Sequence, residues 1–216
     1  MSDALLRNPV ILTAKNTGFS IVSLLLLMAC GNSGGSTEAE NARATSAGAL
    51  APSADWADAG ADFVGADGAV RGEVVFKEAS KGGVMLRVEV NGLAQGWHGI
   101  HLHQVGDCSD GAEGFKASGG HVNPDGFQHG LLNPQGHERA DLPNLYAGAG
   151  GHARAEIFAP GLSLSVGAEG PVENGLYNLL DNDGFAVVVH ENADDHMTQP
   201  IGGAGARVAC AAVKQE

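Results

Sequence analysis

Alternating apolar and polar residues mark much of the chain beyond residue 68. The segments 69–79 (AVRGEVVFKEA) and 83–93 (GVMLRVEVNGL) alternate with a period of two, and the link Lys81-Gly82-Gly83 predicts that they form a β-hairpin. Other apolar or alternating segments predict further strands at 98–103, 152–159, 162–166, 185–190 and 207–213. No segment of the sequence shows the apolar spacing of a helix longer than two turns.

Two long stretches, about 104–143 and 191–206, lack periodicity and are rich in Gly, Pro, Asn, Asp and His. Loops of this length inside a compact domain usually carry function. Seven or eight antiparallel strands at this spacing predict an all-β fold. We expect a Greek-key β-sandwich or flattened barrel of about eight antiparallel strands with two long functional loops.

The first residues have the pattern of an export signal. Arg7 and Lys15 precede the apolar run 19–30 (FSIVSLLLLMAC), which is shorter than a bilayer span. Its end, Leu27-Met28-Ala29-Cys30, resembles the lipobox of bacterial lipoproteins, in which the cysteine becomes the lipidated first residue. We expect a signal peptide at 1–29 and a periplasmic protein anchored to a membrane through Cys30. Ordinary cleavage nearby is the alternative.

Residues 30–62 contain small and charged residues without a periodic apolar face. They predict a flexible tether, or a terminal extension without a spacer role, ahead of a domain at 63–216.

Composition narrows the class of protein. The 216 residues suit one domain plus tails, and 33 glycines with few aromatic residues favour a loop-rich all-β protein. The formal charge of −13 argues against nucleic acid or an anionic membrane surface as the main partner. We therefore expect membrane contact only through the lipid at Cys30.

The three cysteines fit an exported lipoprotein. If Cys30 carries lipid, Cys108 and Cys210 are left as one pair, and export permits a disulfide bond. The bond would close a loop of about a hundred residues, which stabilises a fold by about 4 to 5 kcal/mol in the chain-entropy description. Two unpaired thiols are the alternative.

Histidines gather where chemistry is expected. His101 and His103 project from the same face of an extended strand, so they can converge on one ion, whereas His98 lies on the other face. A half-buried strand that uses His as its polar residue is the alternative. Four imidazoles suit copper, and imidazoles with a carboxylate suit zinc. Candidates at strand ends or in the first long loop are His101, His103, His121, His129, His137, His190 and Asp141.

Five motifs together identify a known pattern: HGIHLH, GGHVNPDGFQHG, DLPNL, VVVHENADD and GGAGARVAC. In order and spacing, over about residues 68–213, they resemble the motif series of the copper/zinc superoxide dismutases. The resemblance implies a copper site made by His101, His103, His121 and His190. It also implies that His121 is shared with a zinc site that includes His129 and Asp141.

The same resemblance assigns supporting residues. Asp194 matches the carboxylate that joins the imidazoles of His101 and His129, and Cys108 and Cys210 match the family's disulfide bond. His98 matches a structural histidine. His152 and His196 have no counterpart, and we expect them to be solvated.

One zinc ligand departs from the family pattern. The family has His-x-x-Asp, but Glu138 stands three residues before Asp141, and the histidine is one place early, at His137. We expect a one-residue adjustment that lets His137 bind. A carboxylate ligand from Glu138 and a weakened zinc site are the alternatives.

The resemblance implies the dismutation of superoxide to dioxygen and hydrogen peroxide, with His121 delivering a proton to the product. Arg207 matches the family's active-site arginine, which draws in and orients the small anion. Pairing of Arg207 with a surface carboxylate is the alternative. The alternative function is a periplasmic copper- or zinc-binding protein of the same fold without dismutase activity. Exported members include monomers and dimers, so a homodimer is possible.

Overall fold

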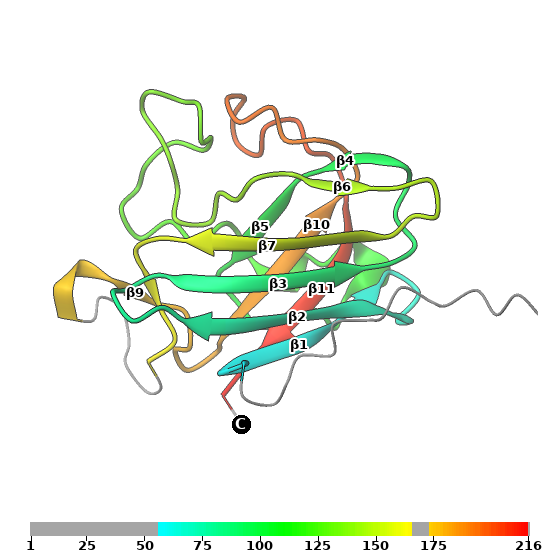
Figure 1. Ribbon diagram of the computed structural model, residues 1–216. Coiled ribbons are helices and arrows are strands. Elements are labelled where there is room, and N and C mark those ends of the chain that lie inside the picture. The colour runs from blue at the N-terminus through cyan, green and yellow to red at the C-terminus, as the bar shows by residue number, and fades with distance from the viewer. Residues whose placement is uncertain (1–55, 166–172, 216) are drawn as a thin grey trace, which may run out of the picture. The chain divides into compact units, whose positions relative to one another are not determined.

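The computed structural model describes residues 56–165 and 173–215, which form an all-β fold (Figure 1). The strands are β1 (Ala59–Gly65), β2 (Val70–Glu78), β3 (Val84–Val90), β4 (Gly96–His98), β5 (Ile100–His103), β6 (Leu145–Ala147), β7 (Ala153–Ala159), β8 (Leu162–Ser163), β9 (Tyr177–Asn178), β10 (Phe185–His190) and β11 (Arg207–Val213). Three short 3₁₀ turns, at Gly111–Glu113, Lys116–Ser118 and Glu173–Gly175, are the helical elements of the described residues.

Seven strands form one curled antiparallel sheet in the order β5-β10-β11-β1-β2-β3-β7. The short strands β4 and β6 form a second sheet. β6 lies next to the edge strand β7, and β4 runs into the other edge strand, β5 (Figure 1). The sheet therefore curls towards closure, and the prediction of an all-β fold built on antiparallel strands is confirmed. β8 and β9 form a small parallel pair.

Alternation explains the predicted hairpin. On β2, Val74 and Phe76 point into the core, and on the paired strand β3, Leu86 and Val88 do the same. β10 is different, because all its residues are buried, as expected of a strand that is covered on both faces. Its first residue, Phe185, packs edge-on against Phe76 with ring centroids 5.1 Å apart.

The ordered fold begins earlier than residue 63. β1 starts at Ala59, inside the predicted tether, and pairs with β2 on one side and β11 on the other. Its small residues and weak alternation give no clear strand pattern in the sequence. It is a strand because pairing on both sides holds it in the sheet. The predicted signal peptide, Cys30 and the tether up to residue 55 lie outside the described residues. Among the described residues there is no helix long and apolar enough to cross a bilayer.

Two other boundaries differ from the prediction. The strand expected at 98–103 breaks at Gly99, because β4 pairs with β6 whereas β5 pairs with β10. The strand expected at 162–166 is reduced to Leu162–Ser163. Neither change moves the two long loops, which leave β5 and β10 where the sequence predicts.

A disulfide bond fastens the first long loop to the last strand. Cys108 and Cys210 are bonded, with their Cα atoms 5.7 Å apart, which confirms the predicted pair. Phe115 from the loop packs beside Cys210 in a small buried cluster with Ala186 and Val188 of β10. The loop is therefore held against the same strands that carry the histidines.

Candidate metal centre

Neighbouring strands and one loop bring the predicted histidines together. In the pairing of β5 with β10, His101 lies opposite Val188 and His103 opposite Ala186. His190 ends β10 on the same sheet. The first long loop then returns to β5 through two isolated bridges, one between His103 and His121 and one between His101 and Asp141.

His101, His103, His121 and His190 form what we call the imidazole cluster, and all four are buried. One ring nitrogen from each of His101, His121 and His190 lies within 4.8 Å of the others. The ring centroid of His103 is 5.2 Å from that of His121 and 6.1 Å from that of His190. The structure thus brings three of the predicted copper ligands to one point and places the fourth, His103, beside them.

Each ring of the imidazole cluster has one nitrogen bonded to the protein and one without a partner. The carboxylate of Asp194, the carbonyl oxygens of Gly119 and Gly205, and the carboxylate of Glu138 accept the bonds. The bonds are His101 Nε2 to Asp194 Oδ2 (2.9 Å), His103 Nδ1 to Gly119 O (2.9 Å), His190 Nδ1 to Gly205 O (3.1 Å) and His121 Nδ1 to Glu138 Oε2 (2.5 Å).

The remaining nitrogens are buried, and the described residues offer them no hydrogen-bond partner: His101 Nδ1, His103 Nε2, His121 Nε2 and His190 Nε2. Buried polar atoms normally have partners. Since an acceptor fixes the N–H on one side of each ring, the other side presents a lone pair, as in metal-bound histidine. Four convergent imidazole lone pairs fit a copper ion.

Burial favours the neutral form of three of these imidazoles, and neutral imidazole is the form that binds metal. Burial, with the neighbouring His101, lowers the pKa of His190 to about 3. Burial also lowers the pKa of His101. Burial lowers the pKa of His103 well below its ordinary value, and the nearby His121 and Arg207 act in the same direction. At neutral pH these three rings are therefore in their ligating form.

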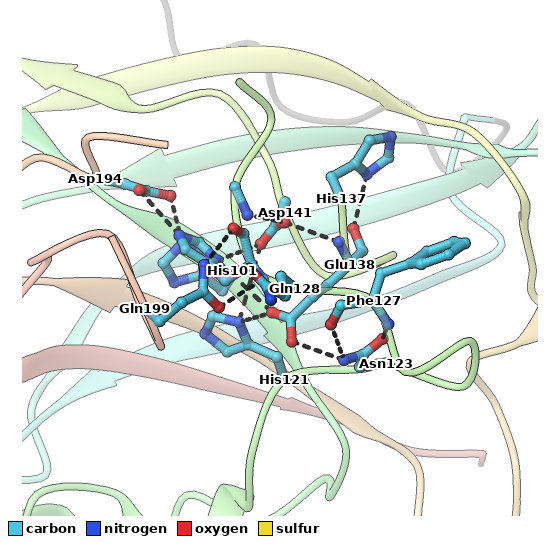
Figure 2. Close-up of polar contacts among 12 residues, drawn as sticks. His101, His121, Asn123, Phe127, Gln128, His137, Glu138, Asp141, Asp194 and Gln199 are labelled. Atoms are coloured by element: carbon cyan, nitrogen blue, oxygen red, sulfur yellow. Dashed lines mark hydrogen bonds and ion pairs between the residues drawn. The ribbon is translucent and has the colours of Figure 1, made fainter. Parts of the chain in front are cut away.

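A second group, the carboxylate cluster, shares His121 and adds His129, Glu138 and Asp141. Its ligand atoms are His121 Nδ1, His129 Nδ1, Glu138 Oε2 and Asp141 Oδ1, all within 4.8 Å of one another. Glu138 Oε2 is 2.5 Å from His121 Nδ1 and 3.6 Å from His129 Nδ1, and Asp141 Oδ1 is 2.7 Å from His129 Nδ1 (Figure 2). Two nitrogens and two carboxylate oxygens are a donor set that zinc accepts.

Hydrogen bonds from the loop fix both carboxylates. Asp141 Oδ2 accepts the backbone N–H groups of Gly130 (2.8 Å) and Glu138 (2.9 Å), which leaves Oδ1 facing the cluster without a hydrogen-bond partner in the described part of the chain. Glu138 Oε1 accepts the side-chain amide of Asn123 at 2.8 Å. The oxygens directed at the cluster are held in place by bonds made elsewhere on the same side chains.

His137, the residue we expected to complete the zinc site, lies outside the cluster. Its ring is exposed, and Nδ1 is 2.8 Å from the carbonyl oxygen of Glu138 (Figure 2). The backbone N–H of Glu138 binds Asp141, and its carbonyl accepts the N–H of Asp141 at 3.2 Å. This turn directs the Glu138 side chain inward and its neighbour outward. The structure therefore brings Glu138 into the site in place of His137.

Charge distinguishes the carboxylate cluster from the imidazole cluster. Burial alone would favour neutral Glu138, but hydrogen bonds from His121 and His129 outweigh it and lower its pKa to about 2. Burial likewise opposes a charge on His129, but the carboxylates of Asp141, Asp194 and Glu138 raise its pKa to about 11. Fixed anions thus face protonated imidazole, and a bound cation would displace these protons.

Asp194 connects the two clusters. Its buried carboxylate accepts from His101 Nε2 at 2.9 Å and from His129 Nε2 at 3.1 Å. Burial would raise its pKa, but the hydrogen bonds from both histidines lower it far below the ordinary value. The backbone at Gly202 approaches this carboxylate so closely that a Cβ there would lie against Oδ1, so a larger residue would displace it.

Arg207 is anchored beside the imidazole cluster. In the sheet it lies opposite His190, and its guanidinium donates to Phe115 O (2.6 Å), Ser118 Oγ (2.9 Å) and Gly119 O (2.9 Å). The Gly119 carbonyl also accepts from His103, so one oxygen fixes both side chains. Among the residues described, Arg207 forms no ion pair, which argues against pairing with a surface carboxylate.

The other histidines have structural contacts. His98 is buried, with its ring nitrogens 2.8 Å from His190 O and 2.9 Å from Ala94 O. His152 pairs with Glu89 at 3.1 Å. His196, which we expected to be solvated, instead contacts Asp194.

Two amide side chains were missed by the sequence analysis. Asn123 holds Glu138, and Gln199 binds both the N–H (3.0 Å) and the carbonyl (2.8 Å) of His129. The sequence position of neither residue indicates a role at the site, because each binds a residue that only the folded chain brings close.

Comparison with known proteins gives a consistent result. Residues 70–213 match the sequence profile of the family described as Copper/zinc superoxide dismutase (SODC). A superoxide dismutase (Cu-Zn) of Caulobacter vibrioides is 49% identical over 149 residues, which cover 68% of this chain and 80% of that protein. The superoxide dismutase-like protein YojM of Bacillus subtilis is 37% identical and covers 70% of this chain and 73% of that protein.

Solved structures agree with the sequence relatives. The crystal structure of a SOD-like protein from Bacillus subtilis is 36% identical and superimposes with a TM-score of 0.64, covering 71% of this chain and 96% of that one. The Cu/Zn superoxide dismutase of Brucella abortus is 29% identical, with a TM-score of 0.53 and coverage of 71% and 97%.

Proposed function

This chain belongs to the copper/zinc superoxide dismutase family and is an enzyme that converts superoxide to dioxygen and hydrogen peroxide with copper and zinc, and we propose which of its side chains carry the reaction. The observation that carries the assignment is the set of buried, unpartnered ligand atoms in the described residues. Four of these atoms belong to the imidazole cluster, and two, His129 Nδ1 and Asp141 Oδ1, belong to the carboxylate cluster, which shares His121.

The copper ligands in this proposal are His101, His103, His121 and His190, through the four nitrogens that lack hydrogen-bond partners in the described structure. Copper supplies a one-electron redox couple, which zinc does not have. Burial keeps His101, His103 and His190 neutral, and each of the four rings is fixed by a bond to its other nitrogen.

The zinc ligands in this proposal are His121, His129, Glu138 and Asp141. Glu138 replaces the histidine of the family pattern, because its carboxylate oxygen lies 2.5 Å from His121 Nδ1 while the ring of His137 is exposed. A cation in this cluster would be surrounded by two carboxylates, which favours a divalent ion over a proton on His121 Nδ1.

Two side chains act directly in the reaction. Arg207 provides a fixed positive charge beside the imidazole cluster of an otherwise acidic protein, and this charge attracts and orients the superoxide anion. His121 is the histidine whose two nitrogens face different clusters. When Nε2 is not acting as a ligand, it can hold a proton and deliver it to the forming peroxide, while Nδ1 stays fixed by Glu138.

Metal analysis combined with a superoxide-consumption assay on the purified protein tests the function. We expect one copper and one zinc per chain and rapid consumption of superoxide. Bound copper without consumption would instead favour a copper carrier of the same fold, and absence of both metals after reconstitution would refute the proposed ligands. An anchored arginine beside the imidazole cluster has no use in a carrier, which supports the enzyme.

We also propose that residues 1–29 are a signal peptide, that Cys30 is lipidated, and that the protein lies in the periplasm on a membrane anchor. The apolar run before Cys30 and the likeness of residues 27–30 to a lipobox support this. Labelling with palmitate in a bacterial host tests it: wild type should be labelled and membrane-bound, and Cys30→Ser should be neither. Sedimentation of the purified protein would distinguish a homodimer from a monomer.

A further inference from the structure

The second long loop carries a histidine that neither cluster uses. His196 follows Asp194 by two residues, and its side chain is only 17% exposed. The motif series of the family has no counterpart for it. Its environment is therefore a feature of this chain that the metal ligands do not explain.

His196 contacts both oxygens of the Asp194 carboxylate. Its backbone N–H donates to Oδ1 at 2.6 Å, and its ring Nδ1 lies 3.2 Å from Oδ2. Oδ1 also accepts from His129 and Oδ2 from His101. Each oxygen thus faces one histidine of a metal cluster and one group of His196.

Asn144 determines which nitrogen of His196 carries the proton. The Asn144 amide makes a double contact with the backbone of Asp194: Nδ2 donates to the carbonyl at 2.8 Å, and Oδ1 accepts the N–H at 2.8 Å. This pair fixes the orientation of the amide. Nδ2 also lies 3.2 Å from His196 Nε2, which must accept, so the ring N–H is on Nδ1, whose 3.2 Å contact with Asp194 Oδ2 is an ion-pair contact without hydrogen-bond geometry.

The backbone of His196 is held in an uncommon conformation by the other loop. Its φ is +60°, in the left-handed region that few residues except Gly, Asn, Asp and His adopt. Its carbonyl accepts the N–H of Leu132 at 3.1 Å. At Gly130 a Cβ would clash with the same carbonyl, so only glycine permits this approach.

We propose that His196 is a positioning residue that holds the Asp194 carboxylate in the orientation that links the two metal clusters. This inference rests on the proposed metal ligands. Without the ring, Asp194 could rotate about its side chain, and the imidazoles of His101 and His129 would lose their fixed orientation. Groups that orient metal-binding histidines typically contribute about 10- to 100-fold to metal affinity.

The test compares two substitutions that both tolerate a positive φ. His196→Gly removes the ring, and His196→Asn keeps a short side-chain N–H donor towards Asp194. Zinc affinity is measured by chelator competition, and cobalt substituted for zinc reports ligand geometry through its visible absorption bands. We expect His196→Gly to weaken zinc binding about 10-fold and to shift the cobalt bands. We expect His196→Asn to restore most of both.

Controls separate positioning from folding. His152→Ala removes a histidine that pairs with Glu89 away from the site, and it should change neither zinc affinity nor the cobalt spectrum. If His196→Gly does not fold, His196→Asp serves instead. It is nearly isosteric with His196→Asn but presents an acceptor to Asp194, so it should weaken zinc binding where His196→Asn does not.

Wild-type affinity and spectrum in His196→Gly, or equal losses in His196→Gly and His196→Asn, would overturn the inference. Failure of the proposed function has a different signature, because the wild-type protein itself would then not bind zinc and cobalt in this site.

Discussion

The two metal clusters are built from the same chain by different means. His101, His103 and His190 of the imidazole cluster stand on β5 and β10, where the backbone is fixed by pairing in the sheet. The carboxylate cluster, including the shared His121, comes from the long irregular loop after β5, where Asn123 and Gly130 of the same loop and Gln199 of the second long loop direct the ligands. Ligands on strands are set by alternation, whereas ligands on the loop depend on contacts with remote residues.

The clusters also differ in charge. Burial lowers the pKa values of His101, His103 and His190 and so keeps these rings of the imidazole cluster neutral. In the carboxylate cluster two anions face His129, whose pKa moves up to about 11. A neutral nitrogen set suits copper in either oxidation state, and a cluster with two carboxylates holds a divalent ion of fixed charge. One shared ring therefore joins a site of neutral imidazoles to a site in which two carboxylates face a protonated imidazole.

Removing the shared ring should break both clusters. We expect His121→Ala to lose zinc and copper together and to lower dismutase activity by at least about 100-fold, since a ligand matters more than the groups that orient it. Metal content by mass spectrometry and superoxide consumption check this. Stoichiometric retention of either metal would show that His121 is not shared.

Removing the carboxylate should affect only one cluster. We expect Glu138→Ala to weaken zinc binding by about 10- to 100-fold while copper remains bound, because the imidazole cluster keeps its four nitrogens. Zinc and copper are measured by separate chelator titrations. Glu138→His, which restores the family pattern, is the matched control and should bind zinc. Unchanged zinc affinity in Glu138→Ala would exclude Glu138 as a ligand.

In the metal-free protein, His190 of the imidazole cluster and His129 of the carboxylate cluster should change the free energy of unfolding with pH in opposite directions. His190 has a folded pKa of about 3, below the unfolded value of 6.5, so it should lower stability as pH falls from 6.5 towards 3. His129 has a folded pKa of about 11, so its stabilisation is present below 6.5 and is lost as pH rises towards 11. Each group contributes at most about 1.4 kcal/mol per pH unit.

Urea unfolding of the metal-free protein across pH measures these slopes. His190→Ala should reduce the loss of stability on the acid side, and His129→Ala the loss on the alkaline side. The same change of slope in both variants would contradict the difference in charge between the clusters.

Arg207 should affect only the reaction at the imidazole cluster, because it lies beside that cluster. We expect Arg207→Ala to reduce activity about 10-fold and to reduce its dependence on ionic strength, with both metals retained. Stopped-flow assays over a salt series check this, and Arg207→Lys, which keeps the charge, should recover part of the rate. Full activity in Arg207→Ala would remove this residue from the mechanism.

The smallest effect is expected at the residue next to Glu138. His137→Ala should change zinc affinity less than about 2-fold, since its exposed ring contacts only the Glu138 carbonyl among the described residues. The same chelator titration measures it. A large loss of zinc in this variant would mean that the loop rearranges on binding metal.

The local sequence pattern was sufficient to predict the β-sheet and most residues of the imidazole cluster. Alternation predicted the β2–β3 hairpin, and the apolar run of 185–190 predicted the fully buried strand β10. The two-residue spacing of His101 and His103 placed both rings on one face, because side chains on a strand alternate. The weakly alternating β1 was missed, since two neighbouring strands, rather than its own sequence, hold it in the sheet.

Periodic side-chain direction predicted the fold class, whereas the histidines of the imidazole cluster were implied by the resemblance to the family motif series, and the disulfide partners by the cysteine count together with that resemblance. Only the tertiary structure decided between His137 and Glu138, and only it showed His196 against Asp194. The physical reason is the same in both cases. A side chain in an irregular loop takes its direction from hydrogen bonds that follow no periodic pattern, some local, such as Glu138 N–H to Asp141, and some distant in sequence, such as Asn144 to His196.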